Sequence, residues 1–274
     1  MVIRLAYSPC PNDTFAFHAM THSMVDTEGL QFEVENADVE ELNKRASAGL
    51  YDMCKLSYHA FFKMCHKYVM LNSGSALGYN NGPLLVSRKN SGELTSYSRV
   101  AIPGSMTTAA LLLDIAYPFL KNKTEVLFSE IAQGVMSKKF DAGVLIHEGR
   151  FTYQKEGLRL IRDLGEHWHN LSGNPIPLGG IAVSRGLDKN LQKKIDRILK
   201  KSIEFALEHP DISDEYVSLN AQIADKEIQK KHIELYVNKF SLDLGEEGKN
   251  AVYSLYLKAN KEKEKLMDRD TLFV

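Results

Sequence analysis

The stretch VIRLAYSPCPNDTFAFHAM, residues 2–20, shows how the chain begins to fold. Its first part, VIRLAY, is short and mostly apolar and predicts a β-strand. Turn and capping residues follow, and a helix is expected to start near Asp13 or Thr14. Further strands are expected at 30–34 and 51–57, each after a helical segment. Strands that alternate with helices predict an α/β fold with a mostly parallel sheet.

Two segments of irregular composition predict crossings between two lobes. Residues 88–98 are polar and lack a period, and residues 170–180 are rich in Pro, Gly and Asn. We therefore predict one discontinuous lobe from 1–90 and 181–274, and a second lobe from 97–178 inserted into it. Ligands of such folds bind at the carboxyl ends of strands, between the lobes, so the strand ends are searched for chemistry.

Composition excludes several classes of protein. The 34 basic and 35 acidic residues nearly cancel, which argues against a nucleic-acid partner. No apolar run approaches the ~18–20 residues that span a bilayer, so no membrane partner is expected. The three cysteines show no C-x-x-C spacing, which favours reduced thiols over a disulfide framework or a zinc site. No secretory signal is recognised at the N-terminus, so a cytoplasmic location is predicted.

The first candidate segments lie in the first lobe. The loop Ser8 to Thr14 is either a rigid strand-to-helix turn or a ligand loop, and Asn12 is a secondary candidate within it. Lys55 emerges from an apolar strand, followed by Leu56 and Ser57. A buried ammonium needs a partner, and a ligand carboxylate would be one. The alternative is a surface lysine whose ammonium reaches water.

The next candidate is Thr107 with Thr108, where a strand passes into a helix of small and apolar residues. Backbone N–H groups and the helix dipole make such a start attractive to anions. The alternative is ordinary N-capping by Ser105 or Thr107. The segment lacks both G-x-G-x-x-G and the Walker lysine, which argues against a nucleotide. Asn80, in the Gly- and Asn-rich loop before residue 84, is another secondary candidate.

The strand 142–146 delivers His147 at its carboxyl end, followed by Glu148, Gly149 and Arg150. An imidazole titrates near neutral pH and can accept a proton there. Gly149 would permit a tight turn beneath it. The alternative is a structural histidine that pairs with Glu148 or with the backbone.

Two other features carry less weight. His167 and His169 flank Trp168 and could bind a metal from a strand, but no third ligand is evident. Trp168 could instead stack on an aromatic ligand. Cys10 has no base tied to it in sequence, which argues against a nucleophile. Neither a metal nor another cofactor is expected.

Together these segments resemble the 1,4-dihydroxy-6-naphthoate synthase family of the futalosine route to menaquinone. The resemblance rests on SPCPNDTF at 8–15, Lys55-Leu-Ser57, Thr107-Thr108 and His147-Glu-Gly-Arg150, and it spans most of the chain. It implies a fold similar to type II periplasmic binding proteins, with two α/β lobes and a hinge. It also implies cofactor-free cleavage of cyclic dehypoxanthine futalosine to 1,4-dihydroxy-6-naphthoate, the reaction of a carbon–carbon lyase.

The resemblance assigns roles to individual residues. His147 is expected to be the general base, and Lys55, Leu56, Ser57, Thr107 and Thr108 are expected to hold a carboxylated substrate. Aromatisation of the product would drive the cleavage once a proton leaves. Two alternatives stay open: a chorismate dehydratase-like enzyme of the same pathway, and a non-catalytic solute-binding protein. The sequence does not fix the oligomeric state, and a homodimer is left open.

Overall fold

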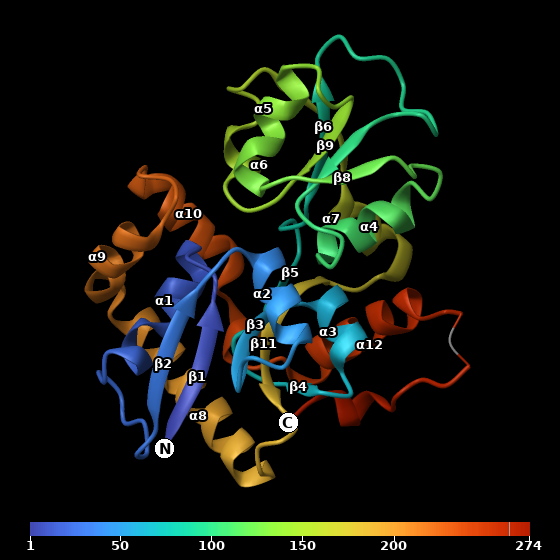
Figure 1. The fold of residues 1–274 in the computed structure, drawn as a ribbon. Helices are drawn as coiled ribbons and strands as arrows, with labels where there is room; N and C mark the ends of the chain where they lie inside the picture. The colour runs from blue at the N-terminus through green and yellow to red at the C-terminus, as the bar shows by residue number, and fades with distance from the viewer. Residues whose placement is uncertain (263) are drawn as a thin grey trace. The chain divides into compact units, whose positions relative to one another are not determined.

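The computed structural model describes residues 1–262 and 264–274. The chain divides into two compact units. The first unit comprises Met1–Gly78 and Pro177–Val274, and the second comprises Tyr79–Ile176. The second unit is therefore an insertion into the first. Figure 1 shows both units as sheets with flanking helices.

The first unit is built on a six-stranded sheet. Its elements are β1 (Val2–Tyr7), α1 (Pro11–Thr21), β2 (Gln31–Asn36), α2 (Val39–Ser47), β3 (Met53–Ser57), α3 (Tyr58–Met64), β4 (Tyr68–Met70), β5 (Ala76–Gly78), β11 (Ile176–Ser184), α8 (Lys189–Glu208), α9 (Pro210–Asn220), α10 (Lys226–Tyr236), α11 (Lys239–Leu242), α12 (Gly245–Ala259) and a 3₁₀ turn η2 (Arg269–Leu272). The strand order is β2-β1-β3-β11-β4, and β5 pairs with β11. β1 runs parallel to β2 and β3, but β11 runs antiparallel to β3 and β4. The sheet is mixed, whereas a mostly parallel sheet was predicted.

Helices α1 and α8 cover one face of this sheet (Figure 1). Alternate residues of β1 share a face, and Leu5 and Tyr7 pack there in a core that also includes Phe17 of α1 and Leu199 of α8. The rings of Tyr7 and Phe17 stack with centroids 4.4 Å apart.

Helix α1 starts earlier than predicted, at Pro11 rather than near Asp13. Proline fits the first helical position because its fixed φ is helical and its missing N–H would have no helical partner there. Cys10 is the N-cap residue, and Asn12, Asp13 and Thr14 therefore lie in the first turn instead of preceding the helix. This register points Asn12 and Asp13 into the interior of the first unit, where both are buried.

The second unit is built on a five-stranded sheet. Its elements are β6 (Leu84–Arg88), β7 (Val100–Ile102), α4 (Thr108–Ala116), β8 (Lys123–Glu125), a 3₁₀ turn η1 (Phe128–Glu130), α5 (Ile131–Met136), β9 (Ala142–Leu145), α6 (Gly149–Thr152), β10 (Leu158–Asp163) and α7 (Leu164–Ser172). The strand order is β10-β6-β9-β7-β8. β7 runs parallel to β8 and β9, while β6 runs antiparallel to β9 and β10. This sheet is mixed as well.

The first boundary between the units differs from the predicted crossing. It falls at Gly78 and Tyr79, ahead of residues 88–98. Strand β6, which the sequence pattern assigned to the first lobe, pairs with β9 and β10 in the second sheet. The second boundary falls at Ile176 and Pro177, at the start of β11.

Two segments of the chain adopt a different structure from the predicted one. Residues 176–180, expected in a crossing, belong to β11. A Cβ at Gly180 would lie 2.6 Å from the sulfur of Met70 on the neighbouring strand, so the glycine serves close strand packing here. Residues 167–169, expected in a strand, lie in helix α7, whose N-cap Asp163 accepts hydrogen bonds from the N–H groups of Gly165 and Glu166.

Among the described residues, no helix combines the length and the apolar character that a membrane crossing requires.

Candidate active site

The first unit contains a buried ion pair between Lys55 of β3 and Asp13 of α1. Lys55 Nζ lies 2.6 Å from Asp13 Oδ1, and both side chains are buried. The Asp13 carboxylate also accepts hydrogen bonds from Ser8 Oγ (2.7 Å) and Asn12 Nδ2 (2.8 Å). The alternative of a surface lysine whose ammonium reaches water is therefore wrong. A ligand carboxylate is also not needed to balance the charge of Lys55, because Asp13 does so.

Asn12 connects this ion pair to His232 of α10. Asn12 Oδ1 lies 2.8 Å from His232 Nε2, and the imidazole is buried. A carboxylate only accepts hydrogen bonds, so the Asn12 NH₂ group must face Asp13 and its carbonyl must face His232. His232 Nε2 therefore carries a hydrogen and donates a hydrogen bond to Asn12 Oδ1. Asn12 was predicted as a secondary candidate, but His232 was not, because it lies 220 residues further along the chain.

Ser57 and Leu56 occupy the end of β3. The Ser57 N–H donates to Asn43 Oδ1 (3.1 Å), and Asn43 Nδ2 donates back to Ser57 Oγ (3.2 Å). Asn43 Nδ2 also lies 3.3 Å from Glu40 Oε2. Leu56 is fully buried in the sheet. The strand end predicted from sequence is thus a polar position that α2 holds in place.

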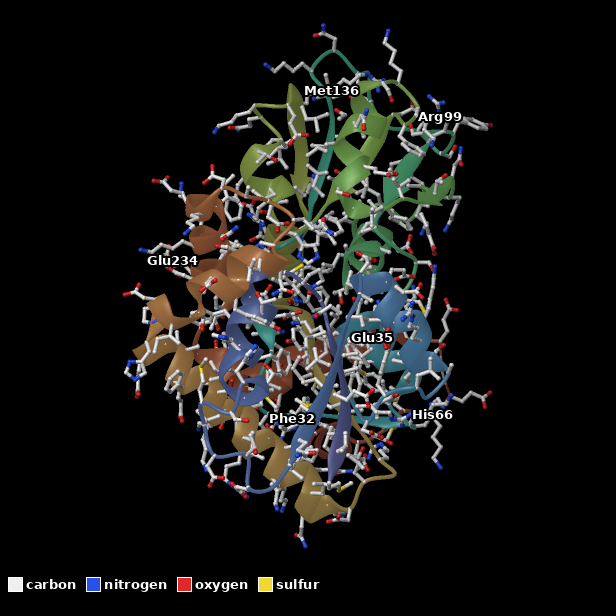
Figure 2. All side chains as sticks on the ribbon, turned by 60° about the vertical axis from the view of Figure 1, so that its left-hand side comes forward. Phe32, Glu35, His66, Arg99, Met136 and Glu234 are labelled. Atoms are coloured by element: carbon white, nitrogen blue, oxygen red, sulfur yellow. The ribbon has the colours of Figure 1, made fainter. Side chains whose placement is uncertain are left out.

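In the second unit, the carboxyl ends of four strands lie together at one edge of the sheet. β7, β8 and β9 run parallel, with Ile102 opposite Glu125, so their carboxyl ends meet at this edge. β10 ends there as well, since Asp163 lies opposite Leu84 at the start of β6 and Leu84 lies opposite Leu145 at the end of β9. Arg99 and Met136 mark the opposite end of this unit in Figure 2. The turns and helix starts that follow these strand ends form the candidate site of the second unit.

Thr107 caps helix α4 at this edge. Its Oγ1 accepts a hydrogen bond from the Ala110 N–H (3.2 Å) and donates one to the Gly104 carbonyl (2.7 Å). Thr108 is the first residue of the helix, and both threonines are buried. The capping role that the sequence left as an alternative is therefore present. Capping also fixes the first turn of α4, whose positive dipole end lies at the same edge as the strand ends.

His147 follows β9 at this edge and has an unusual backbone. Its φ is 52°, in the left-handed region that a residue with a Cβ enters at a cost of about 1–3 kcal/mol. The side chain is half-buried, and its ring centroid lies 4.9 Å from that of Phe128. The turn was expected at Gly149, but Gly149 is the first residue of α6 and the left-handed residue is His147 itself. Strained residues of this kind cluster at active sites.

Arg150 connects the turn at His147 to Gly82 and Asp163. Its guanidinium donates to the Gly82 carbonyl and lies 3.3 Å from Asp163 Oδ2. Glu148, which follows His147 in the turn, is buried. Because Asp163 also caps α7, one ion pair connects the His147 turn, the start of β6 and the start of α7.

The remaining candidates lie in separate segments of the chain, and His167 and His169 do not form a metal site. His167, Trp168 and His169 lie on helix α7, where residues two apart do not share a face. Among the described residues, no group of three or more His, Cys, Asp or Glu could hold a metal ion. Asn80 is exposed and has a φ of 58°. Cys10 is the buried N-cap of α1.

The amino-acid sequence is similar to those of known proteins over nearly its whole length. Residues 3–261 match the model of a menaquinone biosynthesis family. A 1,4-dihydroxy-6-naphthoate synthase of Thermus thermophilus is 42% identical over 260 residues, which cover 94% of this chain and 93% of that protein. A Streptomyces coelicolor protein of the same name is 38% identical over 265 residues, covering 95% and 93% of the two chains.

Solved structures share the fold of this chain. A protein of Archaeoglobus fulgidus superposes with a TM-score of 0.88 at 36% identity, covering 95% of this chain and 97% of that one. A Candida albicans protein with the generic periplasmic binding protein fold (TM-score 0.71, 15% identity, 99% and 93% covered) and the Escherichia coli aliphatic sulphonate binding protein (0.67, 10%, 100% and 92%) share the fold alone. The predicted periplasmic-binding-protein-like α/β fold is thereby confirmed. The chain belongs to the menaquinone biosynthesis family.

Proposed function

We propose that this chain is a 1,4-dihydroxy-6-naphthoate synthase, a carbon–carbon lyase that cleaves cyclic dehypoxanthine futalosine in menaquinone biosynthesis. The observation that carries the proposal is the 42% identity to a 1,4-dihydroxy-6-naphthoate synthase over 94% of the chain. The structure supports it with a strained histidine at a strand end, at the same edge of the sheet as a helix start suited to an anion. We place the reaction in the cytoplasm, in keeping with three buried cysteine thiols.

His147 acts as the general base in this proposal. It accepts a proton from the substrate, and the bond to the sugar-derived fragment then breaks as the product ring becomes aromatic. A positioned base of this kind contributes about 10²–10⁴-fold to the rate. Three features of the structure favour this role: His147 is half-buried, its backbone is fixed in the left-handed region, and the next residues are anchored through Arg150.

Thr107 and Thr108 bind the substrate carboxylate in this proposal. The dipole of an α-helix places about half a positive charge at its first turn, which attracts an anion. Thr107 orients the turn through its bonds to Gly104 and Ala110. A carboxylate is thus stabilised without a lysine or arginine of its own.

Lys55, Leu56 and Ser57 contact the uncharged part of the substrate in this proposal. An ammonium has three donor hydrogens, and Asp13 accepts one of them. Lys55 can therefore donate a hydrogen bond to a substrate hydroxyl while Asp13 balances its charge. Leu56 is fully buried and fixes the strand between the polar side chains of Lys55 and Ser57.

The test is incubation of the purified protein with cyclic dehypoxanthine futalosine, with mass detection of 1,4-dihydroxy-6-naphthoate. Chorismate is offered in a parallel reaction. Formation of the naphthoate from the first substrate alone supports the proposal. Consumption of chorismate would favour a chorismate dehydratase-like enzyme. Binding of the first substrate without any turnover would favour a solute-binding protein.

A further inference from the structure

Four buried side chains form a continuous chain of hydrogen bonds within the first unit. His232 Nε2 lies 2.8 Å from Asn12 Oδ1, and Asn12 Nδ2 donates to Asp13 Oδ1 over 2.8 Å. The same carboxylate oxygen accepts from Lys55 Nζ over 2.6 Å. Each of the four side chains is at least nine-tenths buried. Hydrogen bonds are stronger in a low-dielectric interior, and neighbouring bonds polarise one another. The loss of the bond at His232 is therefore expected to change the bonds made by Asp13 and Lys55.

The chain of hydrogen bonds fixes the orientation of Asn12. A carboxamide can flip, but here its NH₂ group must face the Asp13 carboxylate and its carbonyl must face a donor. His232 is that donor. Without it, the Asn12 carbonyl would be buried without its partner, and the side chain would gain by turning away from Asp13. Asp13 would then lose one of the bonds that hold its Oδ1 toward Lys55.

The position of His232 is itself well defined. It lies on α10, its ring packs on Tyr236 with centroids 4.6 Å apart, and α10 packs against α1. The C-terminal part of the chain thereby reaches the N-terminal loop, 220 residues away in the sequence. No pattern around residue 232 indicates a connection to the segment SPCPNDTF.

We propose that His232 is a positioning residue for substrate binding, which acts through Asn12 and Asp13 on the ammonium of Lys55. This inference rests on the proposed function, since it takes Lys55 as a substrate contact. His232 touches no reacting atom. It holds the Nε2–H donor that keeps Asn12, and with it the Asp13–Lys55 pair, in a single arrangement.

The kinetic test compares His232→Phe with His232→Gln in the full-length protein. Phe keeps a ring beside Tyr236 but removes the donor, whereas Gln keeps an N–H donor. We expect H232F to raise KM for cyclic dehypoxanthine futalosine about tenfold with little change in kcat, as for one lost hydrogen bond. H232Q should restore KM to within about twofold of the wild type. An unchanged KM in H232F, or no rescue by Gln, would overturn the proposal.

The matched control is His18→Phe. His18 is also a buried histidine of this unit, which bonds Ser213 and stacks on Tyr216 of α9. H18F should lower Tm but leave KM unchanged. If H18F raised KM as H232F does, general loosening of the C-terminal helices would explain both variants and the proposal would fail.

A second readout needs no substrate. Reductive methylation of lysines by formaldehyde, followed by peptide mass spectrometry, reports how well each ammonium is protected. We expect slow labelling of Lys55 in the wild type, faster labelling in H232F and protection regained in H232Q. If H232F does not fold, Asn12→Ala removes the same link from the other side and should have the same effect. Equal labelling of Lys55 in all variants contradicts the inference, even where wild-type turnover supports the proposed function.

Discussion

Lys55 Nζ lies 2.6 Å from Asp13 Oδ1, and the two side chains are only 9% and 4% exposed. β3 and the first turn of α1 are thus joined by an ion pair that water hardly reaches. Removing one partner of such a pair leaves an uncompensated charge in the interior, which typically costs 3–5 kcal/mol. The pair therefore bears on both the stability of the first unit and the proposed binding of substrate.

The first prediction concerns stability. Lys55→Met should lower the free energy of unfolding by about 3–5 kcal/mol, because Asp13 remains buried and charged. The double variant Lys55→Met/Asp13→Asn should recover much of this loss, since both charges are gone. Urea denaturation of the wild type, Lys55→Met, Asp13→Asn and the double variant measures both effects.

An exposed ion pair of the same sheet supplies the control. Arg4 Nη2 lies 3.0 Å from Asp52 Oδ1, and the two side chains are 53% and 23% exposed. Arg4→Met should cost no more than about 1 kcal/mol, as surface pairs do. If Lys55→Met lowered the free energy of unfolding no more than Arg4→Met does, the buried pair would contribute no more to stability than an exposed pair.

The second prediction concerns substrate binding by Lys55. Lys55→Met should raise KM for cyclic dehypoxanthine futalosine more than it lowers kcat, because the ammonium is proposed to hold an unreactive part of the substrate. Steady-state kinetics over a range of substrate concentrations give both constants. A fall in kcat at unchanged KM would instead assign Lys55 an interaction made only in the transition state.

The third prediction follows from the left-handed backbone of His147. His147→Gly should raise the free energy of unfolding by about 1 kcal/mol, because glycine enters this region without steric cost. The same variant should lose turnover. Lys138 has a φ of 66° and is exposed in the same unit, so Lys138→Gly should stabilise similarly and leave turnover intact. Loss of stability in His147→Gly would show that side-chain contacts of His147 outweigh its backbone strain.

The fourth prediction concerns pH. Burial, and secondarily the charge of His22, lower the pKa of His18 below its ordinary value of 6.5. The unfolded chain therefore binds the proton more readily than the folded one. The stability that neutral His18 contributes is complete above about pH 6.5 and is lost as the pH falls through the lower folded pKa.

His18→Gln removes this titration and serves as the comparison. The stability difference between wild type and H18Q, measured by urea denaturation from pH 8 to pH 5, should shift against the wild type as the pH falls. A difference that stays constant over this range would show that His18 titrates alike in the folded and unfolded states.

Local sequence pattern predicts the strand ends at which the candidate residues lie. Tyr7 ends an apolar run before capping residues, Leu145 precedes His147, and Thr107 stands where an N-cap is expected. Each of these features depends on neighbours within a few residues. The same is true of the motifs that identify the family.

Partners distant in the sequence could not be predicted in this way. Lys55 was expected either in water or on a ligand carboxylate, but its partner is Asp13, 42 residues earlier. His232 reaches Asn12 over 220 residues. Such contacts depend on how strands and helices pack, and no local period encodes them.

Two local patterns were misleading for physical reasons. The polar-apolar-polar run His167-Trp168-His169 is typical of a strand, yet Asp163 caps a helix that buries Leu164 and Trp168 on the same face. The glycines at 179 and 180 suggested a loop, but they lie within β11, where a Cβ would collide with Leu56 or Met70. In both cases tertiary packing overrode the local preference.

The central claim is that His147 is the proton acceptor of the reaction, and His147→Ala tests it most directly. The rate of naphthoate formation at saturating cyclic dehypoxanthine futalosine is measured beside calorimetric binding of 1,4-dihydroxy-6-naphthoate. We expect H147A to bind the product with nearly wild-type affinity and to lose about 10²–10⁴-fold in rate. A rate equal to that of the wild type at saturation would contradict it.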